Sequence, residues 1–220
     1  MKFGVLRFPG SCDETDAIAA CERVGEAEII WHAEASIGDV DAIIIPGGFS
    51  YGDYLRVGAI ARFAPAMEAV ARFAREGGPV LGICNGFQVL CEARMLPGAL
   101  LPNRSLRFLC RQVEVEVASG DSTWTRACEP GETLSVPVKH TTGCFFAPPE
   151  QLAEIESSGQ VVFRYGAGEN PNGSVNDIAG VRNEAGNVVG LMPHPEHAVD
   201  PLTGSTDGLK LFQSAALAPA

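Results

Sequence analysis

Residues 79–91 read PVLGICNGFQVLC, and the rest of the fold is organised around them. The apolar run from Val80 to Ile83 predicts the end of a buried strand, and residues 85–95 have the periodicity and composition of a helix. Cys84 stands at the turn between the two elements. A strand that feeds directly into a helix places this cysteine at a sharp bend of the backbone.

Glycines stand on both sides of this cysteine. Gly82 and Gly86 give the pattern G-x-C-x-G, the cysteine counterpart of a nucleophile elbow. The apex of such a turn has a strained backbone, and only small flanking residues let the two arms pass closely. The thiol then lies at the first turn of a helix, whose N–H groups and dipole favour a thiolate. Cys84 is the candidate nucleophile, and the alternative is a structural cysteine in a tight turn.

Length and charge limit the possible function classes. The chain has 220 residues, which suits one α/β domain, so we predict a single domain over residues 1–220. Its formal net charge of −11 argues against a nucleic acid or an anionic membrane as a partner, because phosphate contacts need a clustered basic face. The sequence has neither a stretch of roughly 20 apolar residues nor the features of a signal peptide at residues 1–6. We expect a cytoplasmic protein.

The cysteines indicate thiols rather than a disulfide framework. There are seven of them, an odd number, and no two form a C-x-x-C pair. We therefore expect reduced cysteines and no bound metal.

The N-terminal part of the chain alternates strand and helix patterns. The continuous apolar run at residues 41–45 suits a strand that is covered on both faces of a parallel sheet. This alternation predicts a doubly wound, mostly parallel sheet flanked by helices. The expected strands are residues 3–8, 27–31, 41–45 and 80–83, and the expected helices are residues 14–24, 59–75 and 85–95.

The pattern changes after residue 95. A proline- and glycine-rich loop is expected at residues 96–103, and alternating apolar residues then predict an antiparallel insertion after the nucleophile helix. Its strands are expected at residues 106–118, 123–127 and 134–139. The remaining elements are expected as a helix at 149–157, strands at 161–165, 178–182 and 188–192, and a closing helix at 206–217.

A cysteine nucleophile needs a base, and the base needs an orienting group. His194 lies in MPHPEH, residues 192–197, directly after a predicted strand, and two prolines are expected to hold this segment extended. Side chains two apart in extended chain point the same way, so Glu196 can reach the ring nitrogen that faces away from the sulfur. This predicts a catalytic triad of Cys84, His194 and Glu196. His197 is a weaker candidate, since it would point to the opposite face.

The other two histidines carry less information. His32 follows a strand in a polar stretch, and we expect it at the surface. His140 follows Lys139 at a strand end, and the sequence leaves its role open.

Acyl transfer at a cysteine also needs donors for the oxyanion of the tetrahedral intermediate. The backbone N–H of Asn85, directly after the nucleophile, is one expected donor of this oxyanion hole. The second must come from the end of a neighbouring strand. Residues 46–48, PGG, suit this role because glycine lets the backbone approach a substrate closely. We favour Gly48, although the sequence does not separate it from Gly47.

Four stretches together carry a family resemblance. They are PGGFSYGDYLRVGAIA at 46–61, GICNGFQVL at 82–90, LPGALLPNRSLRF at 96–108 and HPE at 194–196. The chain resembles the glutaminase subunits of phosphoribosylformylglycinamidine synthase, which are class I, triad-type glutamine amidotransferases, and the similarity spans nearly its whole length. This resemblance implies the same triad. It also implies a substrate pocket for glutamine lined by Gln88, one helical turn beyond Cys84.

The same resemblance implies a reaction and partners. Such a subunit hydrolyses L-glutamine to glutamate and ammonia through a cysteine thioester. The ammonia passes to a large, ATP-using synthetase subunit that makes formylglycinamidine ribonucleotide in de novo purine biosynthesis, and a small bridging subunit joins the complex. No cofactor is expected on this chain, which lacks a G-x-x-x-x-G-K-[ST] loop, so ATP and Mg²⁺ are expected on the synthetase. Residues 49–56 and 103–108 are the candidate docking face.

The chain departs from the family pattern at two places. Residues 8–14 read FPGSCDE where the family has FPGSNCD, so Cys12 and Asp13 stand in a loop that we expect away from the triad. Thr141-Thr142-Gly143 replaces a Gly-Glu-Gly sequence, which puts in doubt a role for a carboxylate of that loop in holding glutamine or docking the partner.

Two other functions remain open at this point. A cysteine hydrolase or peptidase on a related sheet would use a similar elbow and would cleave peptides or esters without a partner. A binding subunit that has lost its activity is the non-enzymatic alternative, and the change at Thr141-Thr142 keeps it open.

Overall fold

A computed structural model of the chain describes residues 1–217. In its first part, parallel strands alternate with helices, and the central strands β3 and β4 are buried along their whole length. This burial explains why both strands read as uninterrupted apolar runs. The elements are β1 (Lys2–Arg7), α1 (Glu14–Cys21), β2 (Glu26–Trp31), β3 (Ala42–Ile45), α2 (Pro65–Arg75), β4 (Val80–Ile83) and α3 (Asn85–Glu92).

One sheet of nine strands runs through the molecule in the order β2-β1-β3-β4-β11-β10-β9-β6-β7. The strands from β2 to β11 in this order pair in parallel, and those from β11 to β7 pair antiparallel. The predicted doubly wound sheet with an antiparallel part is confirmed, and the antiparallel strands continue the same sheet. They are β6 (Leu109–Val117), β7 (Thr133–His140), β9 (Val161–Tyr165) and β10 (Ile178–Arg182), joined through β11 (Val188–Leu191).

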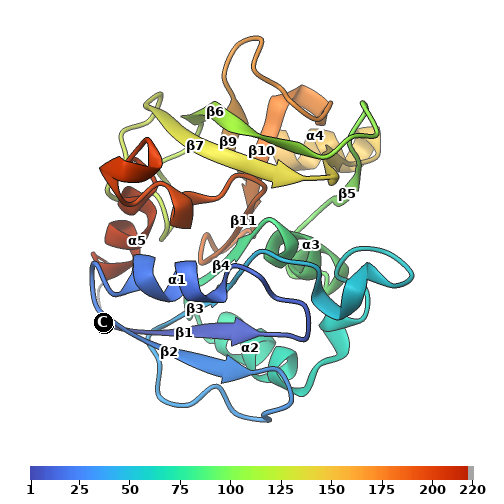
Figure 1. Cartoon of the computed structure of the whole chain (residues 1–220). Coiled ribbons are helices and arrows are strands. Elements are labelled where there is room, and N and C mark those ends of the chain that lie inside the picture. Colours follow the sequence, from blue (N-terminus) through green and yellow to red (C-terminus); the bar gives the residue numbers. More distant parts are fainter. Residues whose placement is uncertain (218–220) are drawn as a thin grey trace.

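Helices cover both faces of the parallel part. In Figure 1, α1 lies on one face, together with the closing helix α5 (Leu209–Ala216), and α2 and α3 lie on the other. The chain leaves β1 toward β2 and leaves β3 toward β4, so the winding direction changes between β1 and β3. Ligands of doubly wound sheets bind beyond the carboxyl ends of the strands at this kind of switch point. The remaining helix, α4 (Pro149–Ser157), lies beside the antiparallel strands.

Trp124 explains one wrong prediction. Residues 123–127, expected as a strand, form consecutive turns, and the Ser122 hydroxyl accepts the Trp124 N–H. The Trp124 ring is fully buried, and its indole N–H donates to the Asn187 carbonyl at 3.3 Å. Burial of this single large ring outweighs the alternating pattern around it.

Pro65 explains a second difference. Residues 59–64, expected in a helix, lie outside α2, because the residue before a proline avoids helical backbone. Ala64 is accordingly extended, with φ −63° and ψ 140°.

Two short strands were also missed. β5 (Ala99–Pro102), where a loop was expected, pairs with β8 (Thr142–Phe146). None of the helices within residues 1–217 has the length and apolar character needed to cross a membrane.

Candidate active site

Cys84 sits at a strained turn between β4 and α3. Its backbone has φ +50° and ψ −102°, a conformation that non-glycine residues rarely adopt. A Cβ atom on Gly86 would lie 1.9 Å from the Ile45 carbonyl oxygen, and one on Gly82 would lie 2.7 Å from the Gly86 backbone. The glycines are therefore required by close contacts between backbones, as the elbow pattern predicts.

The candidate base and its orienting group meet directly. Nδ1 of His194 lies 2.6 Å from Oε1 of Glu196, and both side chains are buried. The expected reason for this contact is wrong: residues 195–197 form a turn of 3-10 helix instead of extended chain. The turn also brings His197 to the same side as His194, with ring centroids 5.4 Å apart, although it was expected to point to the opposite face.

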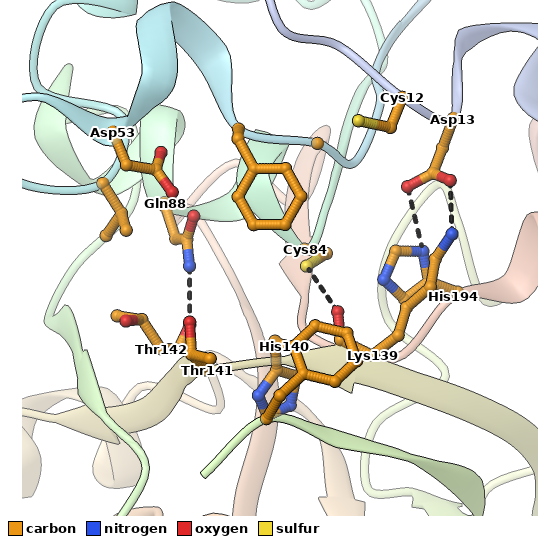
Figure 2. Close-up of a pocket in the computed structure, with 14 residues that line it drawn as sticks. Cys12, Asp13, Asp53, Cys84, Gln88, Lys139, His140, Thr141, Thr142 and His194 are labelled. Atoms are coloured by element: carbon orange, nitrogen blue, oxygen red, sulfur yellow. Dashed lines mark hydrogen bonds and ion pairs between the residues drawn. The ribbon is translucent and has the colours of Figure 1, made fainter. Parts of the chain in front are cut away.

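The electrostatics of His194 favour its protonated form. Burial opposes a charge on the ring, but the Glu196 carboxylate and the Cys84 sulfur outweigh burial and raise the pKa of His194 to about 10. The Cys84 thiol itself is directed toward the Lys139 carbonyl, 3.9 Å away (Figure 2). Nε2 of His194 has no hydrogen-bond partner among residues 1–217. Both groups line one cavity.

The loop after β3 passes beside the nucleophile. Gly48, at φ +146°, lines the cavity with Cys84, and a Cβ there would lie 2.6 Å from the Gly10 carbonyl oxygen. The Gly47 carbonyl accepts the N–H groups of Cys12 and Asp13 at 3.1 and 3.3 Å. These contacts fix the loop, and they put Gly48, not Gly47, at the cavity wall.

Side chains of α3 and its neighbours make the opposite wall (Figure 2). The Asn85 amide donates to Gln88 Oε1 at 2.8 Å, and the Gln88 amide donates to the Thr142 carbonyl at 2.6 Å. Asn85 Oδ1 in turn accepts the Ser50 N–H at 3.0 Å. Asp53 is half-buried on this wall, and burial raises the pKa of its carboxyl to about 6. Gln88 thus lies on the cavity wall, and Asp53 is a lining residue that sequence reasoning missed.

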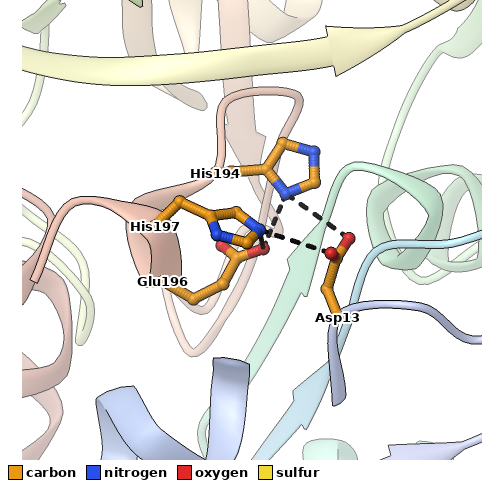
Figure 3. Close-up of side chains that lie close together, drawn as sticks. All are labelled: Asp13, His194, Glu196 and His197. Carbon is orange, nitrogen blue, oxygen red and sulfur yellow. Dashed lines mark hydrogen bonds and ion pairs between the residues drawn. The ribbon is translucent and has the colours of Figure 1, made fainter. Parts of the chain in front are cut away.

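The loop of residues 8–13, expected away from the triad, lies against it. Asp13 is buried, with Oδ2 3.7 Å from Nδ1 of His194 and Oδ1 3.3 Å from Nε2 of His197 (Figure 3). Its Oδ1 also pairs with the Lys139 ammonium. The loop follows β1, one of the two strands at the switch point, and this position was the signal in the sequence for a site residue.

Imidazoles and carboxylates this close together could also hold a metal ion. The Lys139 ammonium already supplies a positive charge beside Asp13, and Nδ1 of His194 is engaged by Glu196 at 2.6 Å. We therefore assign the cluster to proton chemistry.

The two remaining histidines have defined surroundings. His140 is buried in the cavity wall, where its Nδ1 lies 3.0 Å from Asn103 Oδ1. Burial, together with the charge on His194, lowers the pKa of His140 to about 4, so this ring is neutral near pH 7. His32, expected at the surface, is half-buried, and its Nδ1 lies 2.6 Å from the Tyr51 hydroxyl.

Comparison with known proteins decides the family. The sequence profile of the CobB/CobQ-like glutamine amidotransferase domain matches residues 1–216. The chain belongs to the CobB/CobQ-like glutamine amidotransferase family. This amidotransferase is 61% identical over 215 residues to the phosphoribosylformylglycinamidine synthase subunit PurQ of Rubrobacter xylanophilus, a match that covers 97% of each chain.

Solved structures agree with this assignment. A chain in the structure of PurLQS from Thermotoga maritima is 42% identical to this amidotransferase, with a TM-score of 0.89 and coverage of 97% and 96% of the two chains. A glutamine amidotransferase from Thermotoga maritima, 17% identical with a TM-score of 0.62, covers 99% of this chain and 96% of its own and shares the fold. The family resemblance seen in the sequence is confirmed.

Proposed function

We propose that this chain is the glutaminase subunit of a phosphoribosylformylglycinamidine synthase, with Cys84, His194 and Glu196 as its catalytic residues. One observation carries the chemistry: a strained elbow cysteine and a buried, carboxylate-held imidazole line the same cavity. The relatives named PurQ supply the biological context.

The first half of the reaction releases ammonia. The Cys84 thiolate attacks the side-chain carbonyl carbon of glutamine, and the oxygen takes up negative charge. Backbone N–H groups of Gly48 and Asn85 stabilise this oxyanion. Protonated His194 then donates its proton to the amide nitrogen, the C–N bond breaks, and ammonia leaves behind a glutamyl thioester.

The second half releases glutamate. His194, now neutral, accepts a proton from water as the oxygen attacks the thioester carbonyl. The tetrahedral intermediate collapses, the C–S bond breaks, and the thiolate is restored beside the imidazolium. Because a carboxylate only accepts hydrogen bonds, Glu196 keeps the proton of the neutral ring on Nδ1. Nε2 is then the atom that exchanges protons with the substrate.

The cavity wall suits the polar groups of an amino acid. Gln88 and the Thr142 carbonyl present amide and carbonyl groups, and Asp53 presents a carboxylate that can pair with the α-ammonium of glutamine. The cavity has a volume of about 80 Å³, and its lining includes the rings of Phe49 and Phe108. A space this small suits one amino-acid side chain and argues against the extended peptide groove that a peptidase needs.

Ammonia must pass to the partner without release into solvent, because in water near pH 7 it is mostly protonated and no longer nucleophilic. The surface around the cavity mouth carries large exposed apolar side chains, which mark protein interfaces. We assign the docking face for the ATP-using synthetase to this surface, with ATP and Mg²⁺ bound on that partner and the complex in the cytoplasm. Its exposed members are Phe49, Tyr54, Leu55, Leu106 and Phe108.

Glutamate release by the chain, measured alone and with the separately purified synthetase subunit and ATP, tests this proposal. We expect glutamate to be released from glutamine, faster when the partner is present. Cleavage of peptide or ester substrates without any turnover of glutamine would instead support the hydrolase alternative.

A further inference from the structure

Asp13 occupies a position that normally caps a helix, yet it caps nothing. It directly precedes α1, where an aspartate usually accepts N–H groups of the first turn. Here its side chain makes no cap hydrogen bond, and the carboxylate is buried instead. A buried carboxylate is costly unless it is paired, so its partners indicate what it does.

Those partners are all cationic or can become so. The Lys139 ammonium and Nε2 of His197 contact one carboxylate oxygen, and Nδ1 of His194 lies 3.7 Å from the other. Although burial opposes ionisation, the His197 and His194 rings and the lysine hold the pKa of Asp13 well below its usual range. Asp13 therefore carries a full negative charge at neutral pH beside the base.

The missing side chain at Gly47 allows Asp13 and His194 to approach each other. A Cβ atom on Gly47 would lie 2.3 Å from Oδ2 of Asp13 and 2.8 Å from Cε1 of His194. The two side chains therefore meet over a residue that has no side chain of its own. The Gly47 carbonyl also accepts the backbone N–H of Asp13 at 3.3 Å, so the carboxylate, the imidazole and the loop beside Gly48 are held together.

We propose that Asp13, held by Lys139, is a positioning residue for the base: its carboxylate stabilises protonated His194 and fixes the ring over Gly47. Glu196, at 2.6 Å, is the direct hydrogen-bond partner, and Asp13 acts from 3.7 Å through its charge and through packing. Lys139 prevents the two carboxylates from repelling each other at close range.

Groups from several elements face His194, and each contributes to its titration. His140 is neutral near pH 7, so it contributes little charge. The groups are Glu196 and His197 on its own segment, Asp13 before α1, Cys84 at the elbow, and Lys139 and His140 on β7.

NMR titration of the ring of His194 in the ¹⁵N-histidine-labelled full chain tests the proposal without glutamine. Asp13→Asn removes the negative charge and lowers the pKa of His194 by about one unit or more, the size expected for a charge within 4–6 Å. Lys139→Met removes the positive charge and raises this pKa. Asp16→Asn, which removes a half-exposed charge from α1, leaves the pKa of His194 unchanged.

The double variant Asp13→Asn/Lys139→Met removes both charges and leaves no unpaired lysine. It replaces Asp13→Asn in the titration if that single variant fails to fold. We expect His194 still to titrate below its wild-type value, because Oδ2 of Asp13 lies 3.7 Å from Nδ1 of His194 whereas Lys139 pairs with the other oxygen of that carboxylate. Unchanged titration in Asp13→Asn, or shifts of the same sign in both single variants, would overturn the proposal.

A second readout rests on the function proposed above. In Asp13→Asn the high-pH limb of kcat/KM for glutamine moves to lower pH by the same amount as the NMR pKa. A shifted His194 pKa without any glutaminase activity would contradict the proposed function alone. Glutaminase activity with an unshifted limb would contradict the role of Asp13 alone.

Discussion

Nδ1 of His194 lies 2.6 Å from Oε1 of Glu196, and this pair is buried beside the elbow cysteine. The carboxylate fixes the ring tautomer and stabilises the imidazolium that donates a proton to the leaving ammonia. The pair thereby links a local turn, residues 195–197, to the proposed chemistry at Cys84.

Glu196→Gln tests this link. Glutamine keeps the size of the side chain and can still accept from Nδ1, but it removes the negative charge. We expect kcat for glutamine hydrolysis to fall by roughly 10²-fold, within the range of general acid–base contributions, while the fold is retained. Glu184→Gln, at an exposed turn, is the matched control. Equal losses in Glu196→Gln and Cys84→Ala would mean that Glu196 does more than orient the base.

Gly48→Ala tests the oxyanion loop. The new Cβ would lie 2.6 to 2.8 Å from backbone atoms of residues 10–12, so the loop that carries Gly48 must shift. Loss of one oxyanion donor typically lowers kcat by about 10²–10³-fold. Gly131→Ala also substitutes a glycine of positive φ, but nothing lies within 4 Å of the added atom. Wild-type kcat in Gly48→Ala would remove Gly48 from the site.

Gly86→Ala tests the packing of the elbow. The added Cβ would lie 1.9 Å from the Ile45 carbonyl oxygen, so α3 must separate from β3. Overpacking of this kind costs about 1–3 kcal/mol or more, which we expect as a lower urea midpoint of unfolding. Gly77→Ala, with open space around the added atom, should lose only about 1 kcal/mol from its positive φ. Equal midpoints for the two variants would contradict the close contact.

Asp53 predicts a pH dependence of glutamine binding. Burial raises the pKa of its carboxyl to about 6, so the group is charged above this pH and neutral below it. The α-ammonium of glutamine stays positive throughout, and we expect KM to rise as pH falls from 7 to 5. Loss of a hydrogen bond to a charged group costs about 1.5–3 kcal/mol, or roughly tenfold or more in KM.

Asp53→Asn is the variant that tests this assignment. Its KM should be high and nearly constant between pH 7 and 5, whereas the exposed variant Asp39→Asn should follow the wild type. If the KM of Asp53→Asn still rises as the pH falls from 7 to 5, another group is responsible for the pH dependence.

The sequence was informative where one local pattern decides the structure. The apolar strands and the G-x-C-x-G turn predict the parallel sheet and the elbow, because both depend on neighbours in the chain. Trp124 shows the limit: its turn is stabilised by burial against Asn187, far along the chain, which no alternating pattern reveals.

In the candidate site, too, a contact between neighbours in the chain was predicted, and the contacts of Asp13 with distant segments were not. The His194–Glu196 contact was predicted from side chains two apart in extended chain, but a 3-10 turn produces it. Asp13 was missed because its partners, Lys139 and His194, come from β7 and from the segment after β11. The strand order β1-β3-β4-β11 brings Asp13 and the segment after β11 to the same end of the sheet. A hydrogen bond from the His194 N–H to the Pro137 carbonyl, at 2.8 Å, brings β7 to the same place.

The central claim is that the Cys84 sulfur attacks glutamine. Treatment of the chain with a glutamine analogue that carries an electrophilic diazoketone, followed by peptide mass spectrometry, tests it most directly. We predict one adduct, on the peptide that contains Cys84, formed in parallel with loss of glutaminase activity and absent from Cys84→Ala, while the exposed Cys110 stays unmodified. Glutamate release that persists in Cys84→Ala, or inactivation with the adduct on another cysteine, would contradict the account.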